Sequence, residues 1–266
     1  MTASGADGVR PALAAVVSGA GGGGIGTACA RALAEGGFEV FTIERSAAGR
    51  DVACSQAGVP DGNVLIGDIG DEGSSRRMAE LLESRGMACG ALVHNAARGA
   101  PASKLSDVTE AEFLADLQDI LLGAFFMAKH LHPMMPQGQG RIVFISSSAA
   151  LRGARGRGPS YAAAKAGLHG LARQLALDLS ASGTTVNVVV PFQTLTPRVL
   201  RGGRRTTESI AATARQAVPL GRPAYPEDVA SAVSYLVGPG ASYVTGQILS
   251  LDGGQMLAPP ATVPLV

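Results

Sequence analysis

The chain has no tryptophan, and aromatic residues of every kind make up only 4% of its 266 residues. It has three cysteines, Cys29, Cys54 and Cys89, an odd number with no metal-ligand spacing. They predict neither a disulfide framework nor a metal site, but reduced thiols in a cytoplasmic protein. Residues 1–11 carry no basic segment, and the apolar stretch at 12–17 runs directly into glycines. We therefore expect neither a signal peptide nor a membrane span.

Charge is also scarce and almost balanced. Charged residues make up 16% of the chain, and the formal net charge is +1. This balance gives no reason to expect nucleic acid or a membrane as a partner. Hydrophobic residues make up 46%, which is enough for one large domain with a buried core.

Short apolar runs alternate with longer segments of helical length. Seven runs are almost continuously apolar, as in strands buried on both faces: Leu13–Val17, Val40–Ile43, Val64–Ile66, Ala91–His94, Ile142–Ile145, Thr185–Val190 and Gln247–Leu251. The predicted helices between them are Gly26–Glu35, Ser74–Arg85, Val108–His132, Ser160–Ser180 and Pro226–Leu236. This alternation predicts an α/β chain with a single-domain Rossmann fold, in which a doubly wound, seven-stranded parallel sheet has helices on both faces.

No repeat or linker marks a second domain. We expect one domain over residues 12–256, a polar N-terminal extension at 1–11 and a C-terminal tail at 257–266. Residues 196–222 lack strand character and are rich in threonine, glycine and arginine. They predict a mobile insertion on the substrate side of the active-site edge.

A glycine-rich turn, Ser18 to Gly26, follows the first predicted strand and opens the first predicted helix. Glycines let the backbone approach a pyrophosphate, and the helix N-terminus offers N–H groups and the positive end of a dipole. A turn of this kind can be a plain loop, but its place in an α/β chain favours dinucleotide binding.

Two residues at the end of the second strand bear on the cofactor. Glu44 lies eighteen residues beyond Gly26, close to the spacing of about 20 expected for the acid that binds the adenosine ribose. A carboxylate there accepts both ribose hydroxyls and repels a 2′-phosphate. Arg45 is either a solvated residue or a partner for that phosphate. We expect NAD(H), with NADP(H) as the alternative.

The chemistry-bearing residues lie in the second half. Tyr161 and Lys165 are four apart, which places them on one face of a helix, and Ser147 follows an apolar strand. A lysine cation beside the phenol stabilises the tyrosinate and lowers its pKa from about 10. Ser147 would then hydrogen-bond the substrate oxygen. A tyrosine–lysine pair by itself is more often a packing or surface feature, so the surrounding motifs decide.

Taken together, the motifs from about residue 12 to residue 254 resemble those of the short-chain dehydrogenase/reductase family. In chain order they are Gly19–Gly26, Asp68-Ile69, His94-Asn95-Ala96-Ala97, Ser147, Tyr161-Ala162-Ala163-Ala164-Lys165, Val186–Pro191, Thr196-Pro197, Gly221–Ala230, Thr245-Gly246-Gln247 and Asp252-Gly253-Gly254.

The resemblance implies an alcohol dehydrogenase or ketoreductase (EC 1.1.1.-) that transfers a hydride between nicotinamide and a secondary alcohol or ketone. Ser147, Tyr161 and Lys165 would be catalytic, with Tyr161 as general acid or base. Asp68 would bind the adenine amino group, Asn95 would support the sheet and cofactor, and Pro191–Thr196 would cradle the carboxamide. The implied cofactor contacts are Gly19, Gly24, Ile25, Gly26, Glu44, Arg45, Asp68, Ile69, Asn95, Ala96, Ala97, Tyr161, Lys165, Pro191, Phe192, Thr194 and Thr196.

The chain departs from the family pattern in four places. The glycine turn is one residue longer and begins with serine in place of threonine. Ala97 and Phe192 each replace a glycine. Ile120 stands where the family has a fourth catalytic residue, an asparagine thought to hold a water that relays protons to the lysine. Asp119 is rotated from it by about 100° on a helix, so it is no obvious replacement.

Charge is unevenly distributed. Residues 141–222 hold twelve basic residues but only two acidic ones, Asp178 and Glu208. Arginine forks bind carboxylates and phosphates well, which favours an anionic or carrier-linked substrate. A solvated basic surface or a subunit interface explains most of them equally well. The arginines nearest the predicted site are Arg152, Arg155, Arg157, Arg198, Arg201, Arg204 and Arg205.

Two further hypotheses stay open: a dinucleotide-binding protein with little turnover, which Ile120 favours, and a reductase of imines or enones. His130, His132 and His169 are interpreted as packing or capping residues, and no metal site is expected. The resemblance also implies a homotetramer or homodimer.

Overall fold

The computed structural model describes residues 13–97, 105–153, 158–201 and 206–257. The predicted extension at 1–11 and all of the predicted tail except residue 257 lie outside these ranges.

Seven parallel strands form one sheet in the order β3-β2-β1-β4-β5-β6-β7. Their bounds are β1 Ala14–Ser18, β2 Glu39–Glu44, β3 Val64–Ile66, β4 Cys89–His94, β5 Arg141–Ile145, β6 Thr185–Pro191 and β7 Ile248–Leu251. The order runs outward in both directions from β1 and β4, which is the doubly wound arrangement of a Rossmann fold. The predicted fold class is confirmed, and each predicted strand overlaps an observed one.

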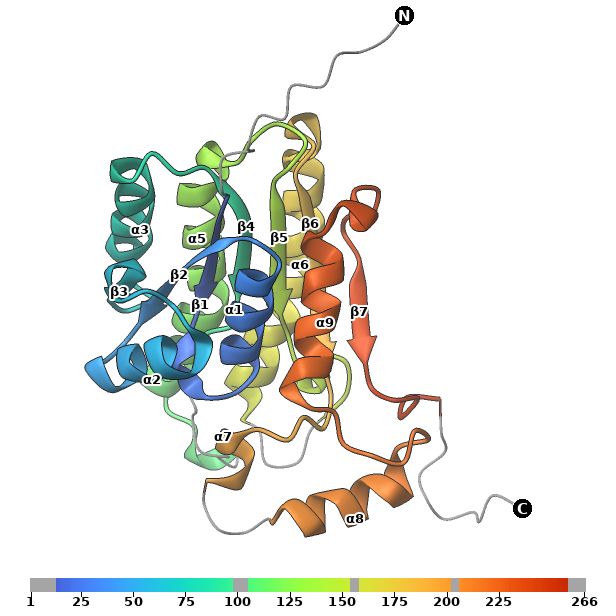
Figure 1. Cartoon of the computed structure of the whole chain (residues 1–266). Helices are drawn as coiled ribbons and strands as arrows, with labels where there is room; N and C mark the ends of the chain where they lie inside the picture. The colour runs from blue at the N-terminus through green and yellow to red at the C-terminus, as the bar shows by residue number, and fades with distance from the viewer. Residues whose placement is uncertain (1–12, 98–104, 154–157, 202–205, 258–266) are drawn as a thin grey trace, which may run out of the picture.

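Helices cover both faces of the sheet (Figure 1). The longer ones are α1 Ile25–Glu35, α2 Ala47–Ala57, α3 Glu72–Ser84, α4 Glu110–Leu117, α5 Gly123–Leu131, α6 Pro159–Asp178, α8 Thr207–Ala217 and α9 Pro226–Val237. One core packs α3, α5 and α6 on the sheet, and a second packs α1, α2 and α9 on the other face.

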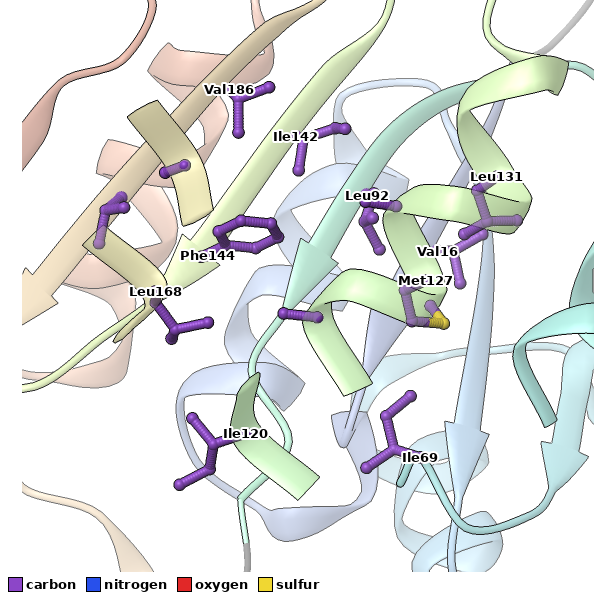
Figure 2. Close-up of a cluster of buried hydrophobic side chains, with 14 of the residues drawn as sticks. Val16, Ile69, Leu92, Ile120, Met127, Leu131, Ile142, Phe144, Leu168 and Val186 are labelled. Atoms are coloured by element: carbon purple, nitrogen blue, oxygen red, sulfur yellow. The ribbon is translucent and has the colours of Figure 1, made fainter. Parts of the chain in front are cut away.

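Side chains from both strands and helices fill the first core (Figure 2). Val16, Leu92 and Ile142 project from neighbouring strands toward Met127 and Leu131 of α5, and all are fully buried. Close packing of this kind fixes the helices on the sheet, and so fixes the loops at the strand ends.

The prediction of one helix over Val108–His132 was wrong in one respect. A π-helical turn, Gln118–Leu122, separates α4 from α5. A π turn inserts one extra residue and rotates everything that follows, and such turns are frequent at functional sites. Here Ile120 is fully buried near Leu168 in the first core (Figure 2), while the carboxylate of Asp119 reaches Arg45.

Candidate active site

The carboxyl ends of the strands open into one cleft of about 1090 Å³. A parallel sheet places ligands at this edge, where the strand order reverses. Every residue predicted for the site lines this cleft except Asp68, whose half-exposed side chain instead accepts a hydrogen bond from the backbone N–H of Gly70. The cleft exceeds the volume of about 300–1,000 Å³ usual for small ligands, so it has room for a dinucleotide and a substrate.

The glycine turn is built for a close approach of backbone. Gly19 and Gly23 have φ of 74° and 67°, a region that favours glycine. A Cβ on Gly26 would lie 2.2 Å from the carbonyl oxygen of Gly19, so only glycine fits where α1 crosses the turn. No side chain caps the N-terminus of α1 at Gly24. The backbone N–H groups there and the helix dipole suit a pyrophosphate.

Glu44 braces the lengthened turn. Its Oε1 accepts hydrogen bonds from the Gly21 N–H at 2.8 Å and from the Thr42 hydroxyl at 2.7 Å, and the residue is only 6% exposed. Burial raises the pKa of the Glu44 carboxyl, and the hydrogen bonds from Thr42, Gly21 and Ala20 oppose that rise. A Cβ on Gly21 would lie 2.7 Å from Oε2, so the turn closes tightly over the carboxylate.

Ser18 joins the ends of β1 and β4. Its Oγ accepts hydrogen bonds from the N–H groups of Asn95 and Ala96, each at 3.1 Å, and lies 3.1 Å from Nδ1 of His94. With both N–H groups donating to Oγ, the Ser18 hydroxyl donates its own proton to Nδ1, which leaves the His94 proton on Nε2. Burial, aided by the charge of Lys165, lowers the pKa of His94 to about 3, so the ring is neutral at working pH.

Three side chains predicted to be catalytic line the same cleft. Ser147 follows β5, and Tyr161 and Lys165 lie one turn apart on α6. The Lys165 ammonium is 5.9 Å from the centre of the Tyr161 ring and donates to the Ile145 carbonyl at 2.6 Å. Lys165 is only 2% exposed, whereas Tyr161 is partly open to the cleft. This arrangement places a phenol beside a buried cation, with a hydroxyl from the neighbouring strand end.

Besides Arg45, three of the described arginines lie in or beside the cleft. The guanidinium of Arg152 stacks 5.2 Å from the centre of the Phe192 ring, and Arg198 and Arg201 line the cleft. Arg201 also donates to the Gly22 carbonyl at 3.4 Å, joining the segment after β6 to the glycine turn. Arg155, Arg157, Arg204 and Arg205 lie outside the described residues.

Several lining residues were not predicted. The wall beside Glu44 comes from α2, whose Ser46 caps the helix and whose Gly49, Val52 and Gln56 face the cleft. Ile210 of α8 also lines it, within residues 196–222, which were predicted to be a mobile insertion and for which no helix was predicted. For α2, the Ser46 cap and the terminating Gly58 were available signals, but the segment Ala47–Ala57 has weak apolar periodicity.

A Rossmann sheet with a glycine turn, an uncapped helix N-terminus and a serine–tyrosine–lysine group defines a nicotinamide-dependent oxidoreductase. Comparison with known proteins agrees. The family described as Enoyl-(Acyl carrier protein) reductase matches residues 19–256. The chain is 36% identical over 244 residues to cis-4-hydroxycyclohexanecarboxylate dehydrogenase of Sinomonas cyclohexanicum, covering 90% of this chain and 95% of that protein.

Two further relatives extend the comparison. The chain is 34% identical to 3-oxoacyl-(acyl-carrier-protein) reductase MabA of Mycobacterium tuberculosis, over 96% of this chain and 98% of that protein. A solved structure of a blue fluorescent protein from a metagenomic library, in complex with NADPH, superposes with a TM-score of 0.79 at 31% identity, over 91% and 97% of the two chains.

The chain belongs to the short-chain dehydrogenase/reductase family, and it is an NAD(P)-dependent oxidoreductase acting on alcohol or ketone substrates. Across the ranges that the structure describes, no helix has both the length and the apolarity of a membrane span. In the same ranges, no three histidine, cysteine, aspartate or glutamate side chains gather as metal ligands would.

Proposed function

We propose that the enzyme interconverts a secondary alcohol and a ketone using NAD(H), on substrates that carry an anionic group. The observation that carries the reaction is the placement of the partly open Tyr161 phenol beside the buried Lys165 ammonium in the cleft. When bound, the nicotinamide supplies or accepts the hydride.

The chain's own residues handle the proton and the substrate oxygen. Tyr161 gives its proton to the carbonyl oxygen during reduction and takes it back during oxidation. Lys165 stabilises the tyrosinate by its charge, and Ser147 donates a hydrogen bond that orients the same oxygen. The uncapped N-terminus of α1 holds the pyrophosphate.

Glu44 supports the proposed preference for NAD(H). It ends β2 and lines the cleft at 6% exposure, so its negative charge would lie next to the ribose. A 2′-phosphate would bring negative charge to the same place. Glu44→Ala should raise KM for NADH and relax the discrimination against NADPH, because a charge-assisted hydrogen bond contributes about 1.5–3 kcal/mol. Tighter binding of NADPH than NADH by the unmodified enzyme would contradict the preference.

Arg152, Arg198 and Arg201 support an anionic substrate, since Arg198 and Arg201 line the cleft and Arg152 stacks on Phe192, which also lines it. One relative is named a cis-4-hydroxycyclohexanecarboxylate dehydrogenase, and another is named a 3-oxoacyl-(acyl-carrier-protein) reductase.

The test measures NADH oxidation with five substrates: 4-oxocyclohexanecarboxylate, its methyl ester, a 3-oxoacyl thioester, an enone and a cyclic imine. We expect the carboxylate to exceed the ester in kcat/KM. Equal kcat/KM for the carboxylate and its ester would mean that the arginines do not recognise the substrate. Activity with the enone or the imine alone would favour a reductase of imines or enones.

We also propose a homo-oligomer. Leu114, Leu122 and Phe125, from α4 through α5, are 52%, 43% and 41% exposed. Apolar side chains gathered along one helical segment are typical of an association surface. Light scattering of the purified enzyme should give a dimer or tetramer, and Phe125→Glu should lower that mass. A monomeric mass for the unmodified enzyme would contradict the proposal.

A further inference from the structure

Arg45 stands at the adenosine end of the cleft, but its charge is already engaged. Its Nη2 donates to Oδ2 of Asp119 at 2.6 Å and lies 3.8 Å from Oδ1 of Asp68. The Arg45 side chain is half exposed, whereas the carboxylate of Asp119 is 0% exposed. One guanidinium therefore faces two carboxylates, one of them fully buried.

The π-helical turn puts Asp119 in this position. Neighbouring contacts hold the turn on the loop after β3: Gln118 donates to the Gly70 carbonyl at 3.2 Å, and the Gly70 N–H donates to Asp68 at 2.9 Å. A Cβ on Gly70 would lie 3.2 Å from Oδ1 of Asp119, so the loop and the carboxylate are in close contact. Asp119 reaches Arg45 from a rigid, packed segment.

Releasing Arg45 from Asp119 carries a penalty. A carboxylate out of contact with solvent is stabilised by a charged partner, and removing that partner from a buried pair is strongly destabilising. A 2′-phosphate that recruited Arg45 would have to bear this cost, and it would also approach the carboxylate of Asp68. The Arg45 guanidinium is therefore next to the ribose end of the cleft, but its ion pair with Asp119 disfavours a contact with a 2′-phosphate.

We propose that Asp119 is a specificity-determining residue: by holding Arg45 it denies the 2′-phosphate of NADPH a cationic partner at the end of β2, and so favours NAD(H). This inference rests on the NAD(H) preference proposed above, and it assigns to the π turn a role at the opposite end of the cleft from catalysis. Because Asp119 does not itself line the cleft, it acts through Arg45 and not on the cofactor.

The experiment is a binding titration of the full-length enzyme with NADH and with NADPH, followed by nucleotide fluorescence, so that it does not depend on turnover. Asp119→Asn keeps the shape of the side chain and removes its charge. The Kd for NADPH should fall by about ten-fold or more, the effect of one charge-assisted contact, while the Kd for NADH changes little. Adding Arg45→Ala to Asp119→Asn should abolish the gain.

Asp116→Asn is the matched control, since it changes another buried carboxylate on the same helical segment that does not contact Arg45. Its ratio of the two Kd values should equal that of the unmodified enzyme. Should Asp119→Asn fail to fold, Asp68→Asn, at a partly exposed position, should shift the ratio in the same direction by a smaller factor. An unchanged ratio in folded Asp119→Asn, or a gain that survives Arg45→Ala, would overturn the inference. The Kd values of the unmodified enzyme show which cofactor it prefers, and the change in their ratio in Asp119→Asn tests the role of Asp119. Failure of the proposed NAD(H) preference can therefore be told apart from failure of this inference.

Discussion

Ser160 of α6 donates a hydrogen bond of 2.6 Å to Asp116 of α4, and both residues are buried. The bond ties the helix before the π turn to the first turn of α6, one residue before Tyr161. A carboxylate near a helix N-terminus is also stabilised by the helix dipole. The two residues therefore fix the start of the helix that carries the phenol and its lysine.

Asp116→Asn and Ser160→Ala should each lower kcat by about ten-fold while leaving the Kd for NADH near its original value, because a small displacement of a catalytic group costs rate more than it costs remote binding. Stopped-flow turnover and fluorescence titration measure the two quantities. Ser84→Ala, which removes an exposed serine on α3, is the control. Equal losses in kcat and in NADH affinity would indicate general disruption of the fold and not a positioned helix.

The strands and the glycine turn could be predicted because they depend on local pattern. Runs such as Ile142–Ile145 are apolar because both faces of the sheet are covered, and the Ser18–Gly26 turn needs glycine at Gly19, Gly23 and Gly26 for backbone reasons. The features on which the proposed cofactor preference depends, in contrast, arise from tertiary packing. The local pattern of residues 110–131 indicates one continuous helix and not the π turn, and the Asp119–Arg45 pair cannot follow from it, since that pair joins residues 74 positions apart.

For Glu44, too, one role could be predicted from the sequence and a second is visible only in the folded structure. Its spacing from Gly26 predicted a ribose-binding acid, and the structure places it at the cleft. Its second task, bracing Gly21 in a turn one residue longer than usual, arises only when the turn closes on it. Helix α8 was missed because Ile210 is the only large apolar residue in Thr207–Ala217, and it is buried there together with Ala214.

Tyr161→Phe should abolish turnover and leave NADH binding nearly intact. General acid catalysis contributes about 10²–10⁴-fold by itself, and the phenol is the only proton donor that the family motif provides. Steady-state kinetics with the best ketone from the substrate panel would measure the loss, with the fluorescence titration as a check on cofactor binding. Retention of more than about a tenth of the original kcat, with an ordered site in a crystal structure, would mean that the proton comes from elsewhere.

His94 should make stability depend on acid. Its pKa is about 6.5 in an unfolded chain and is lowered by burial to about 3 in the folded enzyme, so the unfolded state binds the proton first. The contribution of neutral His94 to the free energy of unfolding is fully present above pH 6.5 and is lost as the pH falls toward 3. The loss should approach about 1.4 kcal/mol per pH unit in that window, beyond what the carboxylates contribute.

Denaturant unfolding of the unmodified enzyme and of His94→Asn at several values between pH 7 and 4 would isolate this slope. The variant should be less stable at pH 7, because Ser18 loses its partner, but its stability should fall less steeply with acid. Ser84→Ala, which removes an exposed serine on α3, should keep the original slope. Parallel pH curves for His94→Asn and the unmodified enzyme would exclude a buried neutral imidazole.

Ile120 is the sharpest departure of the chain from the family pattern. Its side chain is 0% exposed in the first core (Figure 2) and is not among the residues that line the cleft. An apolar pocket of this kind stays dry, since a buried water needs two to four polar partners. We therefore expect no ordered water between residue 120 and Lys165, whose ammonium donates instead to the Ile145 carbonyl.

Ile120→Asn should then lower stability by about 1–3 kcal/mol, through a buried amide in an apolar core, without lowering kcat beyond what that loss explains. Thermal unfolding and turnover of the same preparation give both quantities, and a crystal structure with NADH shows the solvent. A water held by the carbonyl of residue 120 or a neighbour and within hydrogen-bonding distance of Lys165 would contradict the dry pocket. It would show that the proton relay is built from backbone alone, so that isoleucine is compatible with full activity and the hypothesis of a binding protein with little turnover loses its main support.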